Sequence, residues 1–214
     1  VAGVPGDRSV YYAATASGGV WKSTDGGRTF VPIFDDQPIS STGSVAVAES
    51  DPNVVYVGSG EANVRGNVAA GNGIYRSTDA GKTWTQVWKQ VGQIGQMAID
   101  PRSSDIAFAA VLGHAFGPNP ERGVYRTTDG GATWKRVLAI SPDTGVSDVV
   151  LDPRNPDVVY AAAYQRRRHV WTLVEGGPES AIYKSTDGGA TWNKAIAGLP
   201  PVDLGRIGLA VSPA

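Results

Sequence analysis

One eight-residue phrase occurs four times in this chain, and it constrains the fold more than any other feature. The last copy reads Ser-Thr-Asp-Gly-Gly-Ala-Thr-Trp at 185–192, and close variants occupy 23–30, 77–84 and 127–134. The central aspartates lie 54, 50 and 58 residues apart, at Asp25, Asp79, Asp129 and Asp187. Repeats of about 50 residues that each carry one turn phrase are typical of an array of small sheets, and not of one mixed core.

Each copy of the phrase, which we call a box, has the chemistry of a tight turn between two strands. The aspartate can accept hydrogen bonds from backbone N–H groups a few residues on, and the glycines supply positive φ. We expect the aromatic residue that closes the box to pack against the next sheet. A catalytic role for the four aspartates is disfavoured, because an active site needs unequal partners.

A second phrase upstream of the box predicts further strands. An Asp-Pro or Asn-Pro turn leads into a β-branched run at 51–57 and 155–161, and an apolar alternation precedes it, as at 43–47 and 95–99. One unit therefore has four short antiparallel strands, A to D, as in the blade of a β-propeller. No segment has sustained helical periodicity, so we predict an all-β fold with little helix.

The units divide the chain into four repeats, at about 1–42, 43–94, 95–144 and 145–204, and residues 205–214 have the pattern of another strand A. This strand either closes a ring of four blades or begins a further blade. We favour a piece of a larger propeller, because four blades is the small end of the known range. Unpaired blade edges predict association with the rest of such a propeller or with a second copy.

Composition excludes several functional classes. The 214 residues include 19 basic and 20 acidic side chains, so the net charge of −1 gives no case for nucleic-acid binding. The absence of cysteine excludes disulfides, thiolate metal sites and cysteine nucleophiles. No apolar run approaches the roughly 20 residues of a membrane span. Phosphate-loop, dinucleotide-binding and nucleophile-elbow patterns are absent, so we expect no cofactor.

Function is expected on one face of the propeller. Antiparallel strands place the A–B turns and the boxes on one face, and the B–C and D–A loops on the other. The B–C loops differ most in length and chemistry, which is where repeat proteins carry function. The first of them is only 15–18, whereas the others span 59–72, 112–122 and 164–177. Any site therefore lies over blades two to four.

The fourth B–C loop contains a basic run followed by an aromatic residue. Its candidates are Arg166, Arg167, Arg168, His169 and Trp171. Guanidinium and indole groups can bind an anion, or can stack on a sugar ring or an aromatic peptide side chain. The alternative interpretation is a solvated basic loop, or one that forms salt bridges to the next blade.

The second and third B–C loops carry further charged and amide candidates. They are Glu61, Asn63, Arg65 and Asn67, and His114, Glu121 and Arg122. The Glu–Arg combinations suit acid–base or substrate-orienting roles, or they form ion pairs that order long loops. His114 has no second ligand at metal spacing, and the second loop lacks the dense carboxylate alternation of a calcium site, so we predict no metal site.

When the starts of the four A strands are aligned, four different polar residues occupy the same position: Ser44, Gln96, Asp148 and Arg206. If the alignment is right, they lie at equal depth near the channel mouth on the loop face. Their variety favours a ligand-binding role. The alternative is a set of polar channel residues that only meet water.

The phrase Ser-x-Asp-x-Gly-x-Thr-Trp resembles the Asp-box, or bacterial neuraminidase repeat, and its four copies with their flanking strands cover nearly the whole chain. Families that carry it include sialidases, xyloglucan-degrading glycoside hydrolases, sortilin-type receptors and a photosystem assembly factor. The unit length and the Asp-Pro-x-Val-Val-Tyr phrase are most similar to the sortilin-like and xyloglucanase-like group. In these families the boxes lie away from the active site.

The resemblance assigns no catalytic residue. Sialidases use a separated arginine triad with a Tyr–Glu pair and an acidic aspartate, whereas three arginines are adjacent here. The xyloglucanase-like enzymes use two aspartates across a cleft between two propellers. Asp148 or Asp35 can be offered as one of them, but no motif fixes the match.

We therefore expect a non-catalytic propeller segment, secreted, periplasmic or on the cell surface, that binds a polysaccharide or a protein through its B–C loops. One alternative is part of a glycoside hydrolase whose second carboxylate lies outside this chain, and another is a structural assembly subunit. A hydrolase needs two carboxyl groups about 5–10 Å apart. The carboxyl groups to compare are those of Glu61, Glu121, Asp148, Glu175 and Asp35.

Overall fold

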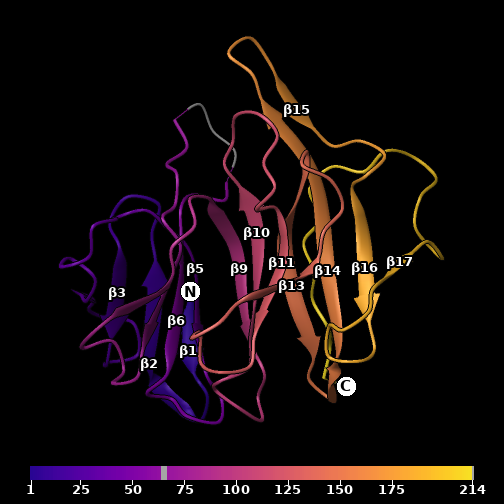
Figure 1. Ribbon diagram of the computed structural model, residues 1–214. Coiled ribbons are helices and arrows are strands. Elements are labelled where there is room, and N and C mark those ends of the chain that lie inside the picture. The colour runs from indigo at the N-terminus through magenta and orange to yellow at the C-terminus, as the bar shows by residue number, and fades with distance from the viewer. Residues whose placement is uncertain (64–66, 214) are drawn as a thin grey trace.

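The computed structural model describes residues 1–63 and 67–213, and every regular element in it is a β-strand (Figure 1). The first sheet contains β1 (Ala2–Val4), β2 (Asp7–Ala14), β3 (Val20–Ser23) and β4 (Val31–Pro32). The second contains β5 (Thr42–Val47), β6 (Val55–Ser59), β7 (Ile74–Ser77) and β8 (Thr85–Trp88). The third contains β9 (Gln93–Ile99), β10 (Ala107–Gly113), β11 (Gly123–Thr127) and β12 (Lys135–Leu138). The fourth contains β13 (Thr144–Asp152), β14 (Asn155–Arg168), β16 (Ala181–Ser185) and β17 (Asn193–Ala195), and β15 (Leu173–Glu175) pairs with β14.

These sheets are blades of a β-propeller, as the repeated strand pattern predicts. Within each sheet the four strands are antiparallel and lie in chain order. The first strands of neighbouring sheets contact one another, from β1 to β5, β9 and β13, so that the sheets lie side by side along the chain (Figure 1). The all-β prediction is confirmed. Within the described ranges there is no helix long and apolar enough to cross a membrane.

Glycines allow the inner strands of adjacent blades to approach closely. A Cβ atom added to Gly43 would lie 2.3 Å from the carbonyl oxygen of Ile94. One added to Gly95 would lie 2.3 Å from the carbonyl oxygen of Ser147. Glycine in a strand often marks such an approach of another backbone. A larger residue at either position would force the blades apart.

Apolar side chains fill the spaces between neighbouring blades and supply the core. Tyr56 and Ile74 of the second blade pack with Met97 and Val111 of the third. Strands β6 and β10 are buried along their whole length, because each has a blade on both sides. Removing this apolar surface from water contributes about 25 cal/mol per Å². Packing between blades therefore holds the arc together.

Each box closes on its aspartate with the same contacts. In the third box Asp129 Oδ1 accepts hydrogen bonds from Thr127 Oγ1 at 2.8 Å and from Thr133 N at 2.9 Å, and Oδ2 accepts one from Thr133 Oγ1 at 2.6 Å. The other three boxes repeat these contacts around Asp25, Asp79 and Asp187. The hydroxyl and then the N–H of the box threonine lower the pKa of each carboxyl group to about 2, because both stabilise its ionised form.

Backbone hydrogen bonds place the boxes and the A–B turns on the same face. Gly130 N donates to the Asp105 carbonyl at 3.0 Å, and Gly188 N donates to the Asp157 carbonyl at 2.8 Å. The first two blades have the same contact, from Gly26 to Ser9 and from Ala80 to Asn53. The predicted sharing of one face by these two kinds of turn is confirmed.

The aromatic residue that closes a box packs against the preceding blade, so the predicted contact with the next blade is wrong. Trp84 Nε1 donates to the Ile33 carbonyl at 2.7 Å, and its ring meets Phe34 edge-on with centroids 5.2 Å apart. Trp134 and Trp192 join the cores shared with the second and the third blade. The box reverses the chain, so the side chain at its end points to the side of the sheet that faces the preceding blade.

Residues 205–213 lie beside β13 without forming a strand, although their pattern predicts one. Leu209 N donates to Asp148 Oδ2 at 2.9 Å, and Ser147 Oγ donates to the Ile207 carbonyl at 3.5 Å. These contacts use side chains of β13 and build no backbone ladder. The segment occupies the side of β13 where the inner strand of a following blade would lie, and the division into repeats stays a prediction.

Candidate functional site

The B–C and D–A loops of the third and fourth blades bind each other on the face opposite the boxes. Arg168 N donates to the Ala115 carbonyl at 2.9 Å, and Asn119 N donates to the Pro142 carbonyl at 2.9 Å. Phe116 and Arg168 also form an isolated parallel bridge. We call the surface formed by residues 60–63, 67–72, 114–122, 139–143 and 164–180 the loop face. It is the part of the molecule where unequal side chains gather.

The three arginines of the basic run lie at the end of strand β14, where the sequence predicts a loop, and Arg167 forms a salt bridge as the alternative interpretation expects. Strand β14 continues beyond its sheet and pairs with β15, with Arg166 opposite Glu175 and Arg168 opposite Leu173. The resulting ribbon projects from the top of the fourth blade in Figure 1. The ladder of β14 and β15 fixes the alternation of the side chains along it.

The tip of this ribbon exposes an aromatic surface. Trp171 is 81% exposed and Val170 is 88% exposed. The imidazole of His169 stacks on the indole of Trp171 with centroids 5.3 Å apart. Phe116, on the adjoining loop, is 55% exposed. Large rings held in water at a defined place are typical of a binding surface.

Arg122 is buried and clamps the loops together through hydrogen bonds. Its side chain is 1% exposed, and its guanidinium donates to the carbonyls of Arg166 at 2.6 Å and His114 at 3.1 Å, and to those of Asp143 and Gly117. Burial, and then the charges of Arg166 and Arg167, lower the pKa of Arg122 to about 10. Among the described residues no salt bridge joins it to Glu121, so the predicted ion pair is wrong. Backbone carbonyls satisfy the guanidinium instead.

Arg166 and Arg167 point to opposite sides of the ribbon and have different partners. Arg166 is 2% exposed and donates to Gln93 Oε1. Arg167 is part of an ion pair with Asp143, and the two side chains are 30% and 37% exposed. A hollow of about 150 Å³ lies beside the Arg167–Asp143 pair, lined by Asp143, Gln165, Arg166, Arg167, His169 and Val174. We call it the ribbon pocket.

A second polar group lies on the channel side of the ribbon. Tyr164 OH donates to Glu175 Oε1 at 3.0 Å. Burial, followed by this hydrogen bond, raises the pKa of Tyr164 to about 12. Tyr164 packs with Ala62 of the second B–C loop. The exposed Arg206 donates to Asn63 Oδ1 at 2.9 Å, which ties the end of the chain to the same loop.

The structure brings the second-loop candidates only partly together. Glu61 is buried at 4% exposure, and its N–H donates to the Ala69 carbonyl at 3.0 Å. Asn67 is exposed. Arg65 lies outside the described residues, so its predicted pairing with Glu61 stays a prediction.

Two of the four aligned strand A residues contact each other directly. Ser44 Oγ donates to Gln96 Oε1 at 3.1 Å and accepts from Met97 N at 2.8 Å. Asp148 accepts from Leu209 N, as described above. Ser44 therefore binds the neighbouring inner strand, and Asp148 binds the segment beside β13. Both residues have a structural role.

His114 has a local partner and no metal-like surroundings. Its Nδ1 atom lies 2.6 Å from the Phe116 carbonyl oxygen. In the described part of the chain no group of three His, Cys, Asp or Glu side chains is arranged to hold a metal ion. His114 therefore orders its own loop.

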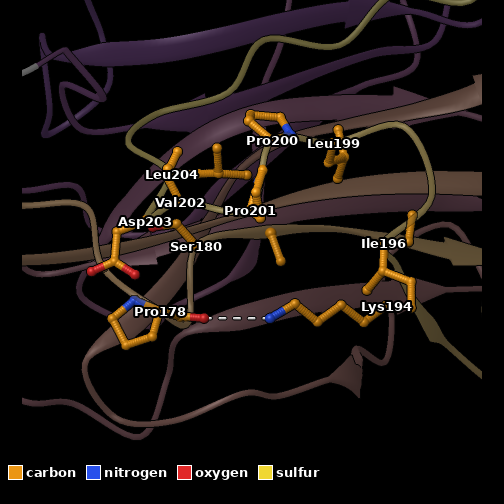
Figure 2. A pocket seen from close by; sticks show the side chains of 13 residues that line it. Pro178, Ser180, Lys194, Ile196, Leu199, Pro200, Pro201, Val202, Asp203 and Leu204 are labelled. Atoms are coloured by element: carbon orange, nitrogen blue, oxygen red, sulfur yellow. Dashed lines mark hydrogen bonds between the residues drawn. The ribbon is translucent and has the colours of Figure 1, made fainter.

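A larger hollow, about 740 Å³, lies away from these groups, at the outer edge of the fourth blade (Figure 2). Segment 196–204 crosses it, with Ile196 77% exposed and Val202 66% exposed. Lys194 Nζ donates to the Pro178 carbonyl at 3.3 Å, and Asp203 lies on the other side in Figure 2. This edge offers apolar surface and few converging polar groups, so it is a weaker site than the loop face.

Sequence reasoning missed the D–A loop residues that complete the loop face. Gln93 holds Arg166, and Asp143 holds Arg167. Glu179 accepts hydrogen bonds from Ser141 and Thr144. Gln93 and Asp143 lie at the strand A starts, and Glu179 lies just before β16, outside the B–C loop that the sequence predicts. The signal available was a polar residue in each D–A loop.

Known xyloglucanases are similar to this chain over most of its length. It is 24% identical over 94% of the chain to a probable oligoxyloglucan-reducing end-specific xyloglucanase of Neosartorya fischeri, and 28% identical over 86% to a xyloglucanase of Hypocrea jecorina. It is 28% identical over 88% to a xyloglucanase of Acetivibrio thermocellus. The chain spans about a quarter of the length of these relatives, 24%, 23% and 24% respectively.

Solved structures of similar enzymes share the fold. An ancestral GH74 enzyme matches with a TM-score of 0.69 at 20% identity, over 92% of this chain and 25% of its own. The GH74 xyloglucanase of Xanthomonas campestris matches with a TM-score of 0.66 at 21% identity, over 92% of this chain and 30% of its own. These likenesses support an arc of blades that is part of a larger propeller protein.

The sequence profile of the Sortilin-Vps10 family (sortilin, neurotensin receptor 3) matches residues 72–200, from the end of the second B–C loop to the end of the fourth blade. This match covers more than half of the chain, and it agrees with the resemblance that the boxes and the Asp-Pro phrase carry. The chain belongs to the Sortilin-Vps10 family.

Proposed function

We propose that this chain is part of a glycoside hydrolase and that its loop face forms a polysaccharide-binding wall of the substrate groove. The observation that carries the proposal is the similarity to xyloglucanases over 86% to 94% of the chain. All four blades take part in such a match, so the relation extends beyond one shared turn. The expectation of a non-catalytic binding module has less support than this alternative.

The loop face has the surface that a sugar chain requires. The stacked rings of His169 and Trp171 project into water at the tip of the ribbon. Flat apolar faces of sugar rings can lie on such side chains, and nearby polar groups can then bind the hydroxyl groups. The face opposite is filled by four equal turns and offers no comparable variety.

The role of this chain within the hydrolase is binding. Hydrolysis requires two carboxyl groups about 5–10 Å apart that face one groove. Asp148 is held by the backbone of Leu209, and Glu175 by the hydroxyl of Tyr164. We assign no catalytic pair within this chain and place the bond-breaking carboxylates in the remainder of the protein.

The proposal also implies an extracellular or periplasmic location. A polysaccharide substrate is a polymer that a cell meets outside its cytoplasm. The chain has no cysteine, so its folding does not depend on disulfide formation in that compartment. Fractionation of cells that express the whole protein checks this location.

The ring of Trp171 gives the most direct test. In the full-length protein, Trp171→Ala should weaken binding of xyloglucan oligosaccharides at least about fivefold, because a stacked ring at an interface contributes more than about 1 kcal/mol. Val170→Ala is the matched control, since it shortens a side chain of equal exposure at the same tip. Isothermal titration calorimetry measures both affinities.

Equal affinities of the Trp171 variant and the parent protein would remove the ribbon tip from the binding surface. A full-length protein that binds no polysaccharide and releases no reducing sugar from one would refute the proposed function altogether.

A further inference from the structure

We propose that the side of the fourth blade that faces away from the third is a docking surface for a further blade of the full-length protein, and that Tyr160 and Lys184 bind the backbone of the box in that blade. The proposal goes beyond the proposed function, because it assigns an interface between blades and not the binding of a polysaccharide. It shares one premise with that function, namely that the chain is part of a longer protein. The chain spans 24% and 23% of two of its relatives.

The interface between the first and second blades shows how such a pair of residues works. Tyr12 and Lys22 lie opposite each other on β2 and β3, and Lys22 Nζ lies 5.2 Å from the centroid of the Tyr12 ring. The Tyr12 hydroxyl donates to the Ala80 carbonyl at 3.1 Å, and Lys22 Nζ donates to the same oxygen at 2.9 Å. Ala80 is the fourth residue of the second box. The pair therefore recognises the backbone of the box in the following blade.

The fourth blade repeats the pair of the first. Tyr160 and Lys184 lie opposite each other on β14 and β16, and Lys184 Nζ lies 5.3 Å from the centroid of the Tyr160 ring. Lys184 comes directly before the box at 185–192, as Lys22 comes directly before the box at 23–30. Within the described ranges, neither the Tyr160 hydroxyl nor Lys184 Nζ takes part in a hydrogen bond, although both are donors. The pair therefore lacks the carbonyl that the same pair binds in the first blade.

The residue types indicate which atom the pair binds. In the second blade an arginine takes the place of the lysine, and Arg76 forms a salt bridge with the Asp105 carboxylate at 2.8 Å. The Tyr56 hydroxyl donates there to the Ser104 carbonyl at 3.1 Å. A guanidinium suits a carboxylate, whereas an ammonium is a compact charge that suits a single oxygen. Lysine together with tyrosine therefore favours a box carbonyl, as in the first blade.

The surroundings of the pair are covered at the other interfaces and open on the fourth blade. The rings that take the place of Tyr160 in the first three blades, Tyr12, Tyr56 and Phe108, are buried. Tyr160 is only half-buried, and with Ile182 it lines a hollow of about 430 Å³. A further blade would remove this apolar surface from water, which favours docking.

The aromatic residue that closes a box also has a place to pack. Trp84 packs on Phe34, which is buried and lies four residues after the end of the first box. Trp88 and Leu138 take the same place in the second and third blades and are also buried. The residue at this place in the fourth blade is Ile196, which is 77% exposed (Figure 2). We place the aromatic ring of the further box on Ile196.

The position of residues 205–213 identifies the occupant of the surface. On the inner strand of the third blade, Met97 N donates to Ser44 Oγ of the second blade at 2.8 Å. Leu209 N makes the same kind of contact with Asp148 Oδ2 at 2.9 Å. Met97 and Leu209 each lie four residues before a proline. The segment thus lies where the inner strand of a following blade belongs, and a second copy of the chain would need that place for its own inner strand.

Lysine reactivity in the full-length protein tests the docking directly. Acetylation of each lysine over time is measured by mass spectrometry, with Lys22 as the bound reference and the exposed Lys135 as the free reference. We expect Lys184 to react at least about tenfold more slowly than Lys135, because an amine held by a carbonyl reacts only when the interface opens locally. A Lys184 rate equal to that of Lys135 would overturn the proposal.

Two pairs of variants locate the effect. Ile196→Asp should raise the Lys184 rate severalfold, because it places a charge where the ring packs. Val170→Asp is the matched control, since Val170 is also exposed in this chain but lies at the tip of the ribbon. Tyr160→Phe should raise the rate less, and Tyr183→Phe, on the side of the sheet that packs on the third blade, should leave it unchanged. Equal rates in Ile196→Asp and Val170→Asp would remove this side of the fourth blade from the interface.

Dilution identifies the source of the docked blade. Protection of Lys184 that persists when the protein is diluted to a monomer, as checked by light scattering, is expected for a blade of the same molecule. Protection that is lost on dilution would assign the surface to a second copy and overturn the proposal. None of these measurements involves a polysaccharide, so their failure leaves the proposed function to be judged by the Trp171→Ala variant.

Discussion

The two faces of this propeller are built from the same strands but differ in how their connections repeat. On one face, four boxes close around Asp25, Asp79, Asp129 and Asp187 with the same hydrogen bonds at nearly the same lengths. On the other face, the B–C connections range from a five-residue turn at 15–19 to a projecting ribbon. Equal turns hold the blades in shape, whereas unequal loops can meet the unequal parts of a ligand.

The comparison is not a simple division between scaffold and site. Arg122 and Arg166 belong to the variable face, yet both are buried and hold backbone or amide groups of other loops. Trp171 and Arg167 lie on the same ribbon and remain accessible. Burial, and not position on the face alone, therefore separates clamps from binding groups.

The largest effect is expected at the buried clamp of the loop face. Arg122→Met should lower the free energy of unfolding by about 3 kcal/mol or more, because hydrogen bonds to a charged group contribute about 1.5–3 kcal/mol each and the carbonyls would lose their donor. Denaturant unfolding measures this loss. Lys135→Met, an exposed change on the same blade, is the control. An unchanged stability would contradict the clamp role of Arg122 and the distinction by burial.

Acid should destabilise the protein by protonating the four box aspartates. Hydrogen bonds lower the pKa of each box aspartate from 3.8 to about 2 in the folded protein, so the folded state binds fewer protons than the unfolded state between these values. The stabilisation is present above about pH 4 and is lost as the pH falls through about 2. Melting temperatures from pH 5 to pH 2 should show this fall, and Asp129→Asn should make it shallower. A flat profile would contradict the box geometry.

Removal of the aspartate from a single box should have the smallest effect. Asp129→Ala removes three hydrogen bonds from one turn, so the melting temperature should fall by a few degrees while the affinity for polysaccharide stays the same. Thermal melting and calorimetry on the same preparation measure the two quantities. Loss of affinity at an unchanged melting temperature would show that the box face takes part in binding.

The box face could be predicted in detail from the sequence, because its contacts are local. Asp129 reaches Thr127 and Thr133, two and four residues away, and a serine or threonine occupies each of these two positions in all four copies. The blade that the closing aromatic residue contacts could not be predicted. The sequence shows that this side chain is apolar, but it does not show on which side of the sheet the side chain lies.

The loop face could be predicted only as a list of residues. The contact of Arg166 with Gln93 joins residues 73 apart, and that of Arg167 with Asp143 joins residues 24 apart. The sequence does not indicate the ribbon, because its turn at 169–172 has no glycine, proline or asparagine to mark a hairpin. The arginine contacts and the ribbon both depend on pairing between residues that are far apart in the sequence.

The location of a bound sugar tests the central claim most directly. We would determine a crystal structure of the full-length protein with a xyloglucan oligosaccharide. The claim that the loop face binds the polymer predicts a sugar ring on Trp171. A sugar bound at the boxes, or at the blade edge shown in Figure 2 with the ribbon empty, would contradict it.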